Sequence, residues 1–130
     1  QANGHGVLLW SAYVEAFETV FPDSGTSHDW TIEENVFTRN GKGIRIAADQ
    51  DHGIRDLPAE RSGRPELRPH HHTIRKNDIQ DNRIGVELVR CDHSTVEGNL
   101  LNRNVEANLR MDDATEVIAR ANLGSAGAYL

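Results

Sequence analysis

Apolar residues alternate with polar ones in short runs along the chain, and turn-forming residues separate the runs. Ile44 and Ile46 flank a charged residue, and Val86 and Leu88 do the same further along. Alternation with a period of two is typical of a strand with one buried face, whereas a helix spaces its apolar residues three or four apart. Asn, Asp and Gly bound the runs, and these residues accept the backbone conformations of tight turns. The pattern therefore predicts many very short strands.

The short runs belong to an internal repeat. The segment NVFTRNGKGIRI at 35–46 returns as NDIQDNRIGVEL at 77–88, and in weaker form as NLLNRNVEANLRM at 99–111. The first step is 42 residues and the second is 22, so we take 22 residues as the unit and place an insertion in the first step. The segment NGHGVLLW at 3–10 matches NGKGIRIA at 40–47 without gaps. A repeat of this length predicts units that stack on their neighbours.

The most economical architecture for these units is all-β: a right-handed parallel β-helix, or solenoid, of about four rungs with one short inserted helix. Rungs of such a stack lie about 4.8 Å apart, so equivalent residues fall above one another. The alternative is an α+β domain with ordinary turn asparagines, but the register agrees at several positions at once and favours the stack.

Stacking predicts two asparagine ladders, in which each side-chain amide bonds to the neighbouring rungs. The first ladder comprises Asn35, Asn77, Asn99 and Asn122, and the second comprises Asn40, Asn82 and Asn104. Glycines at equivalent positions open the following strand, where the backbone is tight or φ is positive. These glycines are Gly6, Gly43 and Gly85.

The fourth unit needs one extra residue between Asn104 and Asn108 to keep this register. With that residue, Leu109 and Met111 face inward. The outward column on the same strands then alternates in charge, which stabilises neighbouring strands by roughly 0.2–1 kcal/mol per pair. This column comprises Leu8, Arg45, Glu87 and Arg110. It is either a solvated face or a surface that binds a substrate.

A consensus runs through the two clearest units, TIEENVFTRNGKGIRI at 31–46 and TIRKNDIQDNRIGVEL at 73–88. Its pattern, T-I-x-x-N-x-I-x-x-N-x-x-G-I-x-L, resembles the parallel β-helix repeat of pectin-lyase-like proteins. That superfamily includes polysaccharide lyases, alginate epimerases, pectin hydrolases and NosD-type periplasmic proteins. The resemblance covers roughly 3–10, 30–48 and 72–124. It implies a carbohydrate-processing or carbohydrate-binding protein that acts on an acidic polysaccharide, in an extracytoplasmic or secreted location.

Two insertions interrupt the repeat, and both follow the same strand one rung apart. Residues 11–29 carry apolar side chains at helical spacing, which predicts a short amphipathic helix that ends at the Pro-Asp-Ser-Gly sequence at 22–25. Residues 47–71 are rich in Pro, Gly and charge, which predicts a long irregular loop. We therefore expect one domain, 1–130, with these two insertions. Long loops on a rigid scaffold frequently carry function.

Stacking is expected to collect acidic and histidine side chains along the edge from which the insertions leave. The candidate catalytic residues are Asp92, His93, Asp112, Asp113 and His52. The candidate substrate-binding residues are Arg45, Glu87, Arg90 and Arg110, and the candidate metal ligands are Asp49 and Asp51; the sequence does not name the metal, and Ca²⁺ is one candidate ion. This set is compatible with glycoside hydrolysis by paired carboxylates, with β-elimination or epimerisation of a uronic acid, or with metal binding.

Each of these assignments has a structural alternative. Aspartates are frequent at turns, so the candidate aspartates can be corner residues alone. The run His70–His72 has no fixed ligand spacing and fits a surface loop. The NGHG at 3–6 and the pair Asp112-Asp113 are similar to pectin-hydrolase motifs, but they occur in the reverse order, so no catalytic role is carried over from that family.

Composition narrows the partners. The chain has 14 basic and 20 acidic residues and a net charge of −6, which argues against nucleic acid and against an anionic membrane surface. The chain has a single cysteine, Cys91, which excludes an internal disulfide. We interpret Cys91 as a small buried residue rather than as a nucleophile.

The ends of the repeat suggest an alternative function. The first unit lacks its first two strands and neither end has a recognisable cap, so we expect either a piece of a longer protein or ends that pair with another copy. End pairing predicts a homodimer or small homo-oligomer. The corresponding function is a non-catalytic structural or assembly module.

Overall fold

The computed structural model describes residues 3–11, 20, 27–48 and 68–124 of the 130-residue chain. The protein is all-β, and its strands form three parallel sheets. The first sheet contains β1 (Asn3–Ser11), β4 (Asn40–Ala48), β7 (Ile84–Val89) and β10 (Ala107–Asp112). The second contains β2 (Thr31–Glu33), β5 (Thr73–Arg75), β8 (Thr95–Glu97) and β11 (Ile118–Arg120). The third contains β3 (Val36–Thr38), β6 (Asp78–Gln80) and β9 (Leu100–Asn102).

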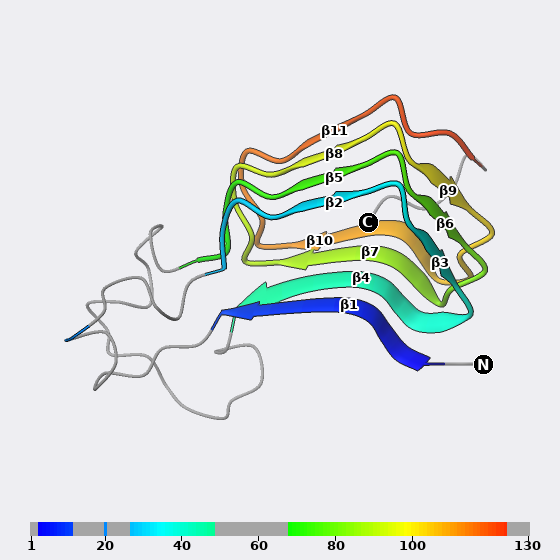
Figure 1. Ribbon diagram of the computed structural model, residues 1–130, viewed down its shortest axis with the longest axis horizontal. Helices are drawn as coiled ribbons and strands as arrows, with labels where there is room; N and C mark the ends of the chain where they lie inside the picture. The colour runs from blue at the N-terminus through cyan, green and yellow to red at the C-terminus, as the bar shows by residue number, and fades with distance from the viewer. Residues whose placement is uncertain (1–2, 12–19, 21–26, 49–67, 125–130) are drawn as a thin grey trace.

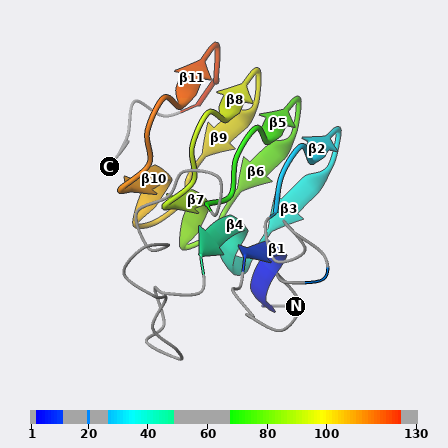
Figure 2. The ribbon, with the colours of Figure 1, turned by 90° about the vertical axis from the view of Figure 1, so that its left-hand side faces the viewer.

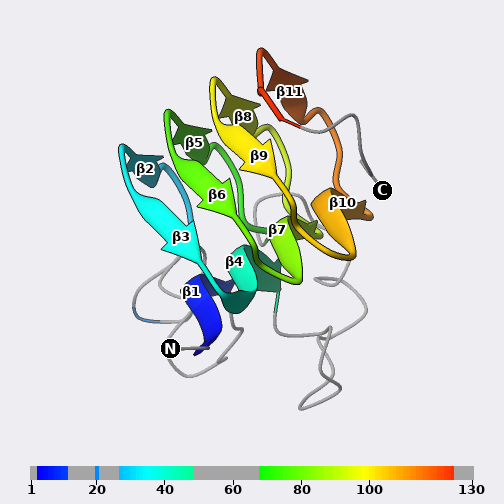
Figure 3. The same ribbon diagram turned by 90° about the vertical axis from the view of Figure 1, so that its right-hand side faces the viewer.

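The chain visits the three sheets in a constant order, as Figure 1 shows. After β1, each pass runs through the second, third and first sheets, so that β2–β4, β5–β7 and β8–β10 are three successive passes. Views from the left-hand and right-hand sides of Figure 1 show equivalent strands side by side (Figures 2 and 3). The prediction of short strands in parallel sheets is confirmed, and the arrangement is consistent with a parallel β-helix.

The register agrees with the repeat. Asn3 pairs with Asn40 and Trp10 with Ala47, as the gapless match of the two segments predicted. Leu109 pairs with Val86, which confirms the extra residue in the fourth unit. Because the side-chain period of a strand is two, a slip of one residue anywhere would have turned the apolar positions outward.

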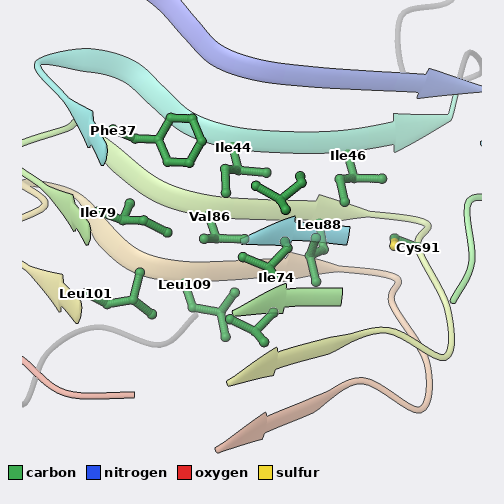
Figure 4. Packing of buried hydrophobic residues seen from close by; sticks show 12 residues of the cluster. Phe37, Ile44, Ile46, Ile74, Ile79, Val86, Leu88, Cys91, Leu101 and Leu109 are labelled. Carbon is green, nitrogen blue, oxygen red and sulfur yellow. The ribbon is translucent and has the colours of Figure 1, made fainter. Parts of the chain in front are cut away.

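The apolar positions of the three sheets meet in one interior, which Figure 4 shows from close by. Ile44 and Ile46 from the first sheet, Ile74 from the second and Ile79 from the third are fully buried. Burying an isoleucine side chain contributes about 1.5–3 kcal/mol, so this interior is the main source of stability.

Met111 departs from the prediction: it pairs with Leu88, yet 37% of its surface is exposed. Its strand, β10, is one of the two edge strands of the first sheet within the described residues.

Both asparagine ladders are present. Asn77 accepts at Oδ1 from the backbone and side-chain amides of Asn35, and Asn99 accepts in the same way from Asn77. Asn122 continues this ladder, and Asn40, Asn82 and Asn104 form the second one. The ladder side chains also satisfy buried backbone groups. The Asn77 side chain, for example, donates to the carbonyl of Ile32.

The corners use side-chain-bearing residues in the left-handed conformation. Asp29, His71, His93 and Glu116 occupy equivalent positions with φ of 58°, 55°, 49° and 53°. Gly43 has a different role, since φ there is not positive; a Cβ on it would lie 2.6 Å from the carbonyl oxygen of Gly85. The glycine at this position is therefore explained by close approach of neighbouring strands.

The two insertions lie mostly outside the described part of the chain. The helix expected in 11–29 falls on residues of which 12–19 and 21–26 are not described, and no helix is among the described elements. Of the loop expected at 47–71, residues 47, 48 and 68–71 are described. Within the residues that are placed, no helix has the length and apolar character needed to cross a membrane.

Candidate functional site

A hollow with a volume of about 370 Å³ lies on the outer face of the first sheet. Its lining comes from β4, β7 and β10 and from the residue that follows β7. It is lined by Lys42, Arg45, Glu87, Val89, Arg90, Arg110 and Asp112. The hollow therefore contains all four predicted substrate-binding residues together with Asp112, one of the predicted catalytic residues.

Three of these side chains form the outward column that the repeat predicted. Arg45 pairs with Glu87, and Glu87 pairs with Arg110, on three neighbouring parallel strands. Parallel strands lie about 4.8 Å apart, so the charged groups meet without distortion of the backbone. The alternation of charge follows directly from stacking one repeat on the next.

Glu87 is the centre of the cluster. Its Oε1 accepts from Lys42 Nζ at 2.8 Å and from Arg45 Nε at 2.7 Å, and Arg110 Nη1 lies 3.8 Å from Oε2. Glu87 is only 4% exposed, so this part of the column is not the solvated face that was one reading of the sequence. A carboxylate so well buried is held by its cations, since an isolated buried charge would be costly.

Lys42 and Arg45 affect the pKa values of two neighbouring groups, Glu87 and His5. Burial alone would raise the pKa of Glu87, but the hydrogen bonds from Lys42 and Arg45 outweigh burial and hold that pKa below its usual value. The pKa of His5 is lowered, first by burial and then by the positive charges of Lys42 and Arg45. Lys42 and Arg45 therefore favour the anionic form of Glu87 and disfavour a proton on His5.

The hollow holds more cationic than anionic groups. Four basic side chains and two carboxylates line it, which is a formal local charge of +2. The Arg110 side chain is 43% exposed, and besides Glu87 it contacts the carboxylate of Glu106 at 3.5 Å. A guanidinium in such a position can bond a ligand carboxylate through two parallel N–H groups.

The predicted catalytic Asp92 lies in a different environment, where its carboxylate is fully engaged. Arg68 Nε lies 3.0 Å from Oδ2, and Oδ1 accepts from the backbone N–H and the hydroxyl of Thr115 at 3.1 and 2.8 Å. Asp92 is 3% exposed. These contacts tie one pass of the chain to the next, so the structural reading of this aspartate is the better supported one.

Arg68 also reaches Asp113, which the sequence placed in the candidate catalytic set. The guanidinium of Arg68 lies 3.6 Å from the exposed carboxylate of Asp113 and donates to its backbone carbonyl. Arg90, at the edge of the hollow, lies 3.7 Å from the same carboxylate. Sequence reasoning missed Arg68 and Lys42. The 22-residue spacing between Arg68 and Arg90 could have indicated the first, because Arg68 belongs to the return of the repeat rather than to an irregular loop.

His93, one of the two predicted catalytic histidines, faces a second hollow, separate from the first. This hollow has a volume of about 430 Å³ and is lined by His71, His93, Ser94, Thr95, Glu116, Val117 and Ile118. His93 Nδ1 lies 3.0 Å from Glu116 Oε2. The structure therefore divides the candidate catalytic set: Asp112 lines one hollow, His93 lines the other, and Asp92 and Asp113 contact Arg68.

The remaining site residues, His52, Asp49 and Asp51, lie outside the described residues. In the described ranges, no group of three or more His, Cys, Asp or Glu side chains is arranged to hold a metal ion. The Ca²⁺ assignment stays a prediction.

Cys91 is part of the apolar interior. It is fully buried, and its Sγ lies 3.3 Å from the hydroxyl of Ser94. Burial raises the pKa of the thiol to about 11, and the hydrogen bond to Ser94 offsets only part of that effect. The thiol therefore stays protonated, as expected of a residue that fills space rather than attacks a substrate.

Comparisons with protein-family models, with curated proteins and with solved structures found no match to this chain. The resemblance to pectin-lyase-like proteins rests on the repeat residues alone.

Proposed function

We propose that this chain is a right-handed parallel β-helix of about four rungs that binds an acidic polysaccharide on the outer face of the first sheet. The observation that carries the proposal is the hollow that four cations, Lys42, Arg45, Arg90 and Arg110, line together with Glu87 and Asp112. The resemblance of the repeat to the pectin-lyase-like superfamily supports the same class of ligand.

The chemistry of the hollow suits a polymer of uronic acids. Each sugar carries a carboxylate for the cations and hydroxyl groups that can donate to Asp112. Equivalent residues on neighbouring strands lie about 4.8 Å apart, so a polymer with regularly spaced carboxylates can contact several strands at once. A polyvalent contact of this kind is strong even where each single ion pair is weak.

Binding is favoured here over catalysis. Hydrolysis or elimination needs an acid and a base within reach of the same bond. Among the predicted catalytic residues that the structure describes, Asp112 alone lines the cationic hollow, and the carboxylate of Asp92 is occupied by Arg68 and Thr115. We therefore propose binding as the principal activity, with lyase or epimerase chemistry as the alternative.

The proposal is tested by affinity electrophoresis through gels that contain polygalacturonate, alginate or a neutral glucan. We expect retardation by the two acidic polymers, weakening as salt is added, and free migration in the neutral gel. Arg110→Gln should weaken binding roughly tenfold, the equivalent of about 1.4 kcal/mol. Arg120→Gln is the matched control, since Arg120 is an exposed arginine paired with Glu97 on the second sheet.

The outcome of a parallel activity assay separates the two alternatives. Absorbance of unsaturated products and the release of reducing ends are followed with the same polymers, with and without Ca²⁺. Product formation would make the protein an enzyme, and equal migration in acidic and neutral gels would contradict the proposed function.

A second candidate function is a structural or assembly module, and one observation favours it. On β11 and just beyond it, Ile118 and Leu123 are 50% and 72% exposed, and they pair with Thr95 and Leu100 of the preceding pass. Apolar side chains beside a strand edge are suited to pairing with another chain. Light scattering at micromolar concentration tests this candidate: a homodimer or small closed oligomer supports it, and a monomer that persists on concentration contradicts it.

A further inference from the structure

Four imidazoles gather at the corner where the chain enters the second sheet. The rings of His28 and His70 are nearly parallel, with centroids 5.2 Å apart, and those of His71 and His93 are nearly parallel at 5.3 Å. The rings of His70 and His71 meet edge to face at 4.9 Å. We call His28, His70, His71 and His93 the histidine corner. None of the four lines the cationic hollow.

The histidine corner lies where both predicted insertions return to the sheets. The backbone N–H of Asp29 donates to the carbonyl of His70 at 3.2 Å, and that of His70 donates to Ser27 at 3.1 Å. The N–H of His71 donates to Asp92 at 3.1 Å. These are isolated bridges rather than full strands, so few backbone bonds hold residues 27–29 and 68–71 against the next pass.

Among the described residues, two carboxylates contact the four imidazoles of the corner directly. Asp29 Oδ2 lies 2.6 Å from His28 Nδ1, and Glu116 Oε2 lies 3.0 Å from His93 Nδ1, so a carboxylate stands at each end of the row. The carboxylate of Asp92 is held by Arg68 and Thr115. The buried ring of His72 lies beneath the corner and is a further group that can gain a proton.

The central contact requires an unprotonated ring. His70 Nδ1 lies 2.7 Å from His71 Nδ1, so one of these nitrogens accepts a hydrogen bond and must carry no proton. Protonation of both rings would place two N–H groups against each other. It would also add positive charge to rings that are stacked on further imidazoles.

We propose that the histidine corner is an acid-sensitive clasp, which holds residues 27–29 and 68–71 against the sheets at neutral pH and releases them when its imidazoles are protonated. Release would also reach the edge of the cationic hollow, because Arg68 contacts Asp113, and Asp113 contacts Arg90. The inference goes beyond the proposed function and does not depend on it, since it concerns the fold in the absence of any ligand.

The test is amide hydrogen exchange at about pH 7 and about pH 5, on either side of the ordinary imidazole pKa. Rates are converted to protection factors, which removes the intrinsic effect of pH on exchange. The reporters are the amides of Asp29, His70 and His71, and the internal references are the ladder amides of Asn77 and Asn99. We expect protection at the corner to fall at least tenfold further at the lower pH than protection of the ladder amides, which report any change in global stability.

A matched double variant, His71→Asn with His93→Asn, removes two titrating rings and keeps residues that tolerate the left-handed backbone found at both positions. Its corner amides should keep their protection at about pH 5. Equal protection of the wild-type corner at the two pH values would overturn the proposal. So would an equal loss in the double variant, or a loss of the same size at the ladder amides, since neither would arise from a local clasp.

Discussion

Asn77 is bonded twice to Asn99 on the next pass of the chain: its backbone N–H and its side-chain amide both donate to Oδ1 of Asn99, each at 3.0 Å. The same side chain donates to the backbone carbonyl of Ile32 on the previous pass. One buried amide thus joins three successive passes. It replaces the water that the turn backbone would otherwise need, which is why the position repeats as asparagine.

Asn77→Ala should lower the free energy of unfolding by roughly 1–3 kcal/mol, because buried polar groups on two neighbouring passes lose their partner. Urea denaturation followed by circular dichroism measures the change. Asp113→Asn is the comparison, since Asp113 is exposed and asparagine tolerates its φ of 49°. We expect that variant to stay within about 0.5 kcal/mol of the wild type. An Asn77→Ala protein as stable as the wild type would show that the ladder is not a source of stability.

Glu87→Gln should destabilise the protein by about 1–3 kcal/mol, because Lys42 and Arg45 would lose their shared anion in a poorly hydrated place. The pKa of Glu87 is depressed in the folded state, so its contribution is present above the ordinary value of 4.5 and is lost as pH falls through the lowered value. Stability should therefore decline more steeply below about pH 4.5 in the wild type than in Glu87→Gln. Parallel slopes in the two proteins would be inconsistent with this role.

His72 should make stability depend on pH in a second window. Its Nδ1 accepts from the backbone N–H of Trp30, so the folded ring is neutral. Burial lowers the pKa of His72 from 6.5 to about 4, although a backbone hydrogen bond with Ser27 acts in the opposite direction. Between these values the unfolded chain binds more protons than the folded one, so stability is complete above pH 6.5 and declines as pH falls to about 4.

The full pKa difference corresponds to roughly 3 kcal/mol. Thermal unfolding measured at intervals across this window should show the decline in the wild type and a flatter curve in His72→Gln. The variant will be less stable at neutral pH, because it loses the acceptor for Trp30, but that loss is independent of pH. A decline of the same size in both proteins would assign the effect to other groups.

Cys91 should be inert towards thiol reagents in the folded protein. Its side chain is fully buried, so a reagent cannot reach the sulfur. Its pKa is raised to about 11, so the reactive thiolate does not form at neutral pH. Ellman's reagent should react within minutes in denaturant and at least a hundredfold more slowly in buffer, at a rate set by unfolding. Rapid labelling of the native protein would contradict the assignment of Cys91 to the interior.

The repeat made most of the fold predictable. Asparagine and glycine positions coincide over several units, so the pairing of Arg45 with Glu87, and of Leu109 with Val86, follows from the sequence alone. The burial of Glu87 does not. The alternating pattern predicts the face of the sheet on which a residue lies. The burial of a residue on the outer face depends on neighbouring long side chains such as Lys42, which do not recur in the repeat.

The candidate site was predictable only in part, for the same reason. Arg45, Glu87, Arg90 and Arg110 come together because they belong to the repeat, and the register brings them to one hollow. Arg68 was assigned to an irregular loop, and its contacts with Asp92 and Asp113 follow from the path of the returning chain. His93 was grouped with Asp92 because they are adjacent in sequence, yet its side chain faces a different hollow.

The most direct test of the central claim is a titration of the ¹⁵N-labelled protein with a short oligogalacturonate, followed by NMR. Binding on the outer face of the first sheet predicts that the shifted amides cluster on β4, β7 and β10, around Arg45, Glu87 and Arg110. The NMR signals of the amides of β5 and β8 on the second sheet should not shift. An unchanged spectrum at millimolar ligand, or shifts confined to the second and third sheets, would contradict the account.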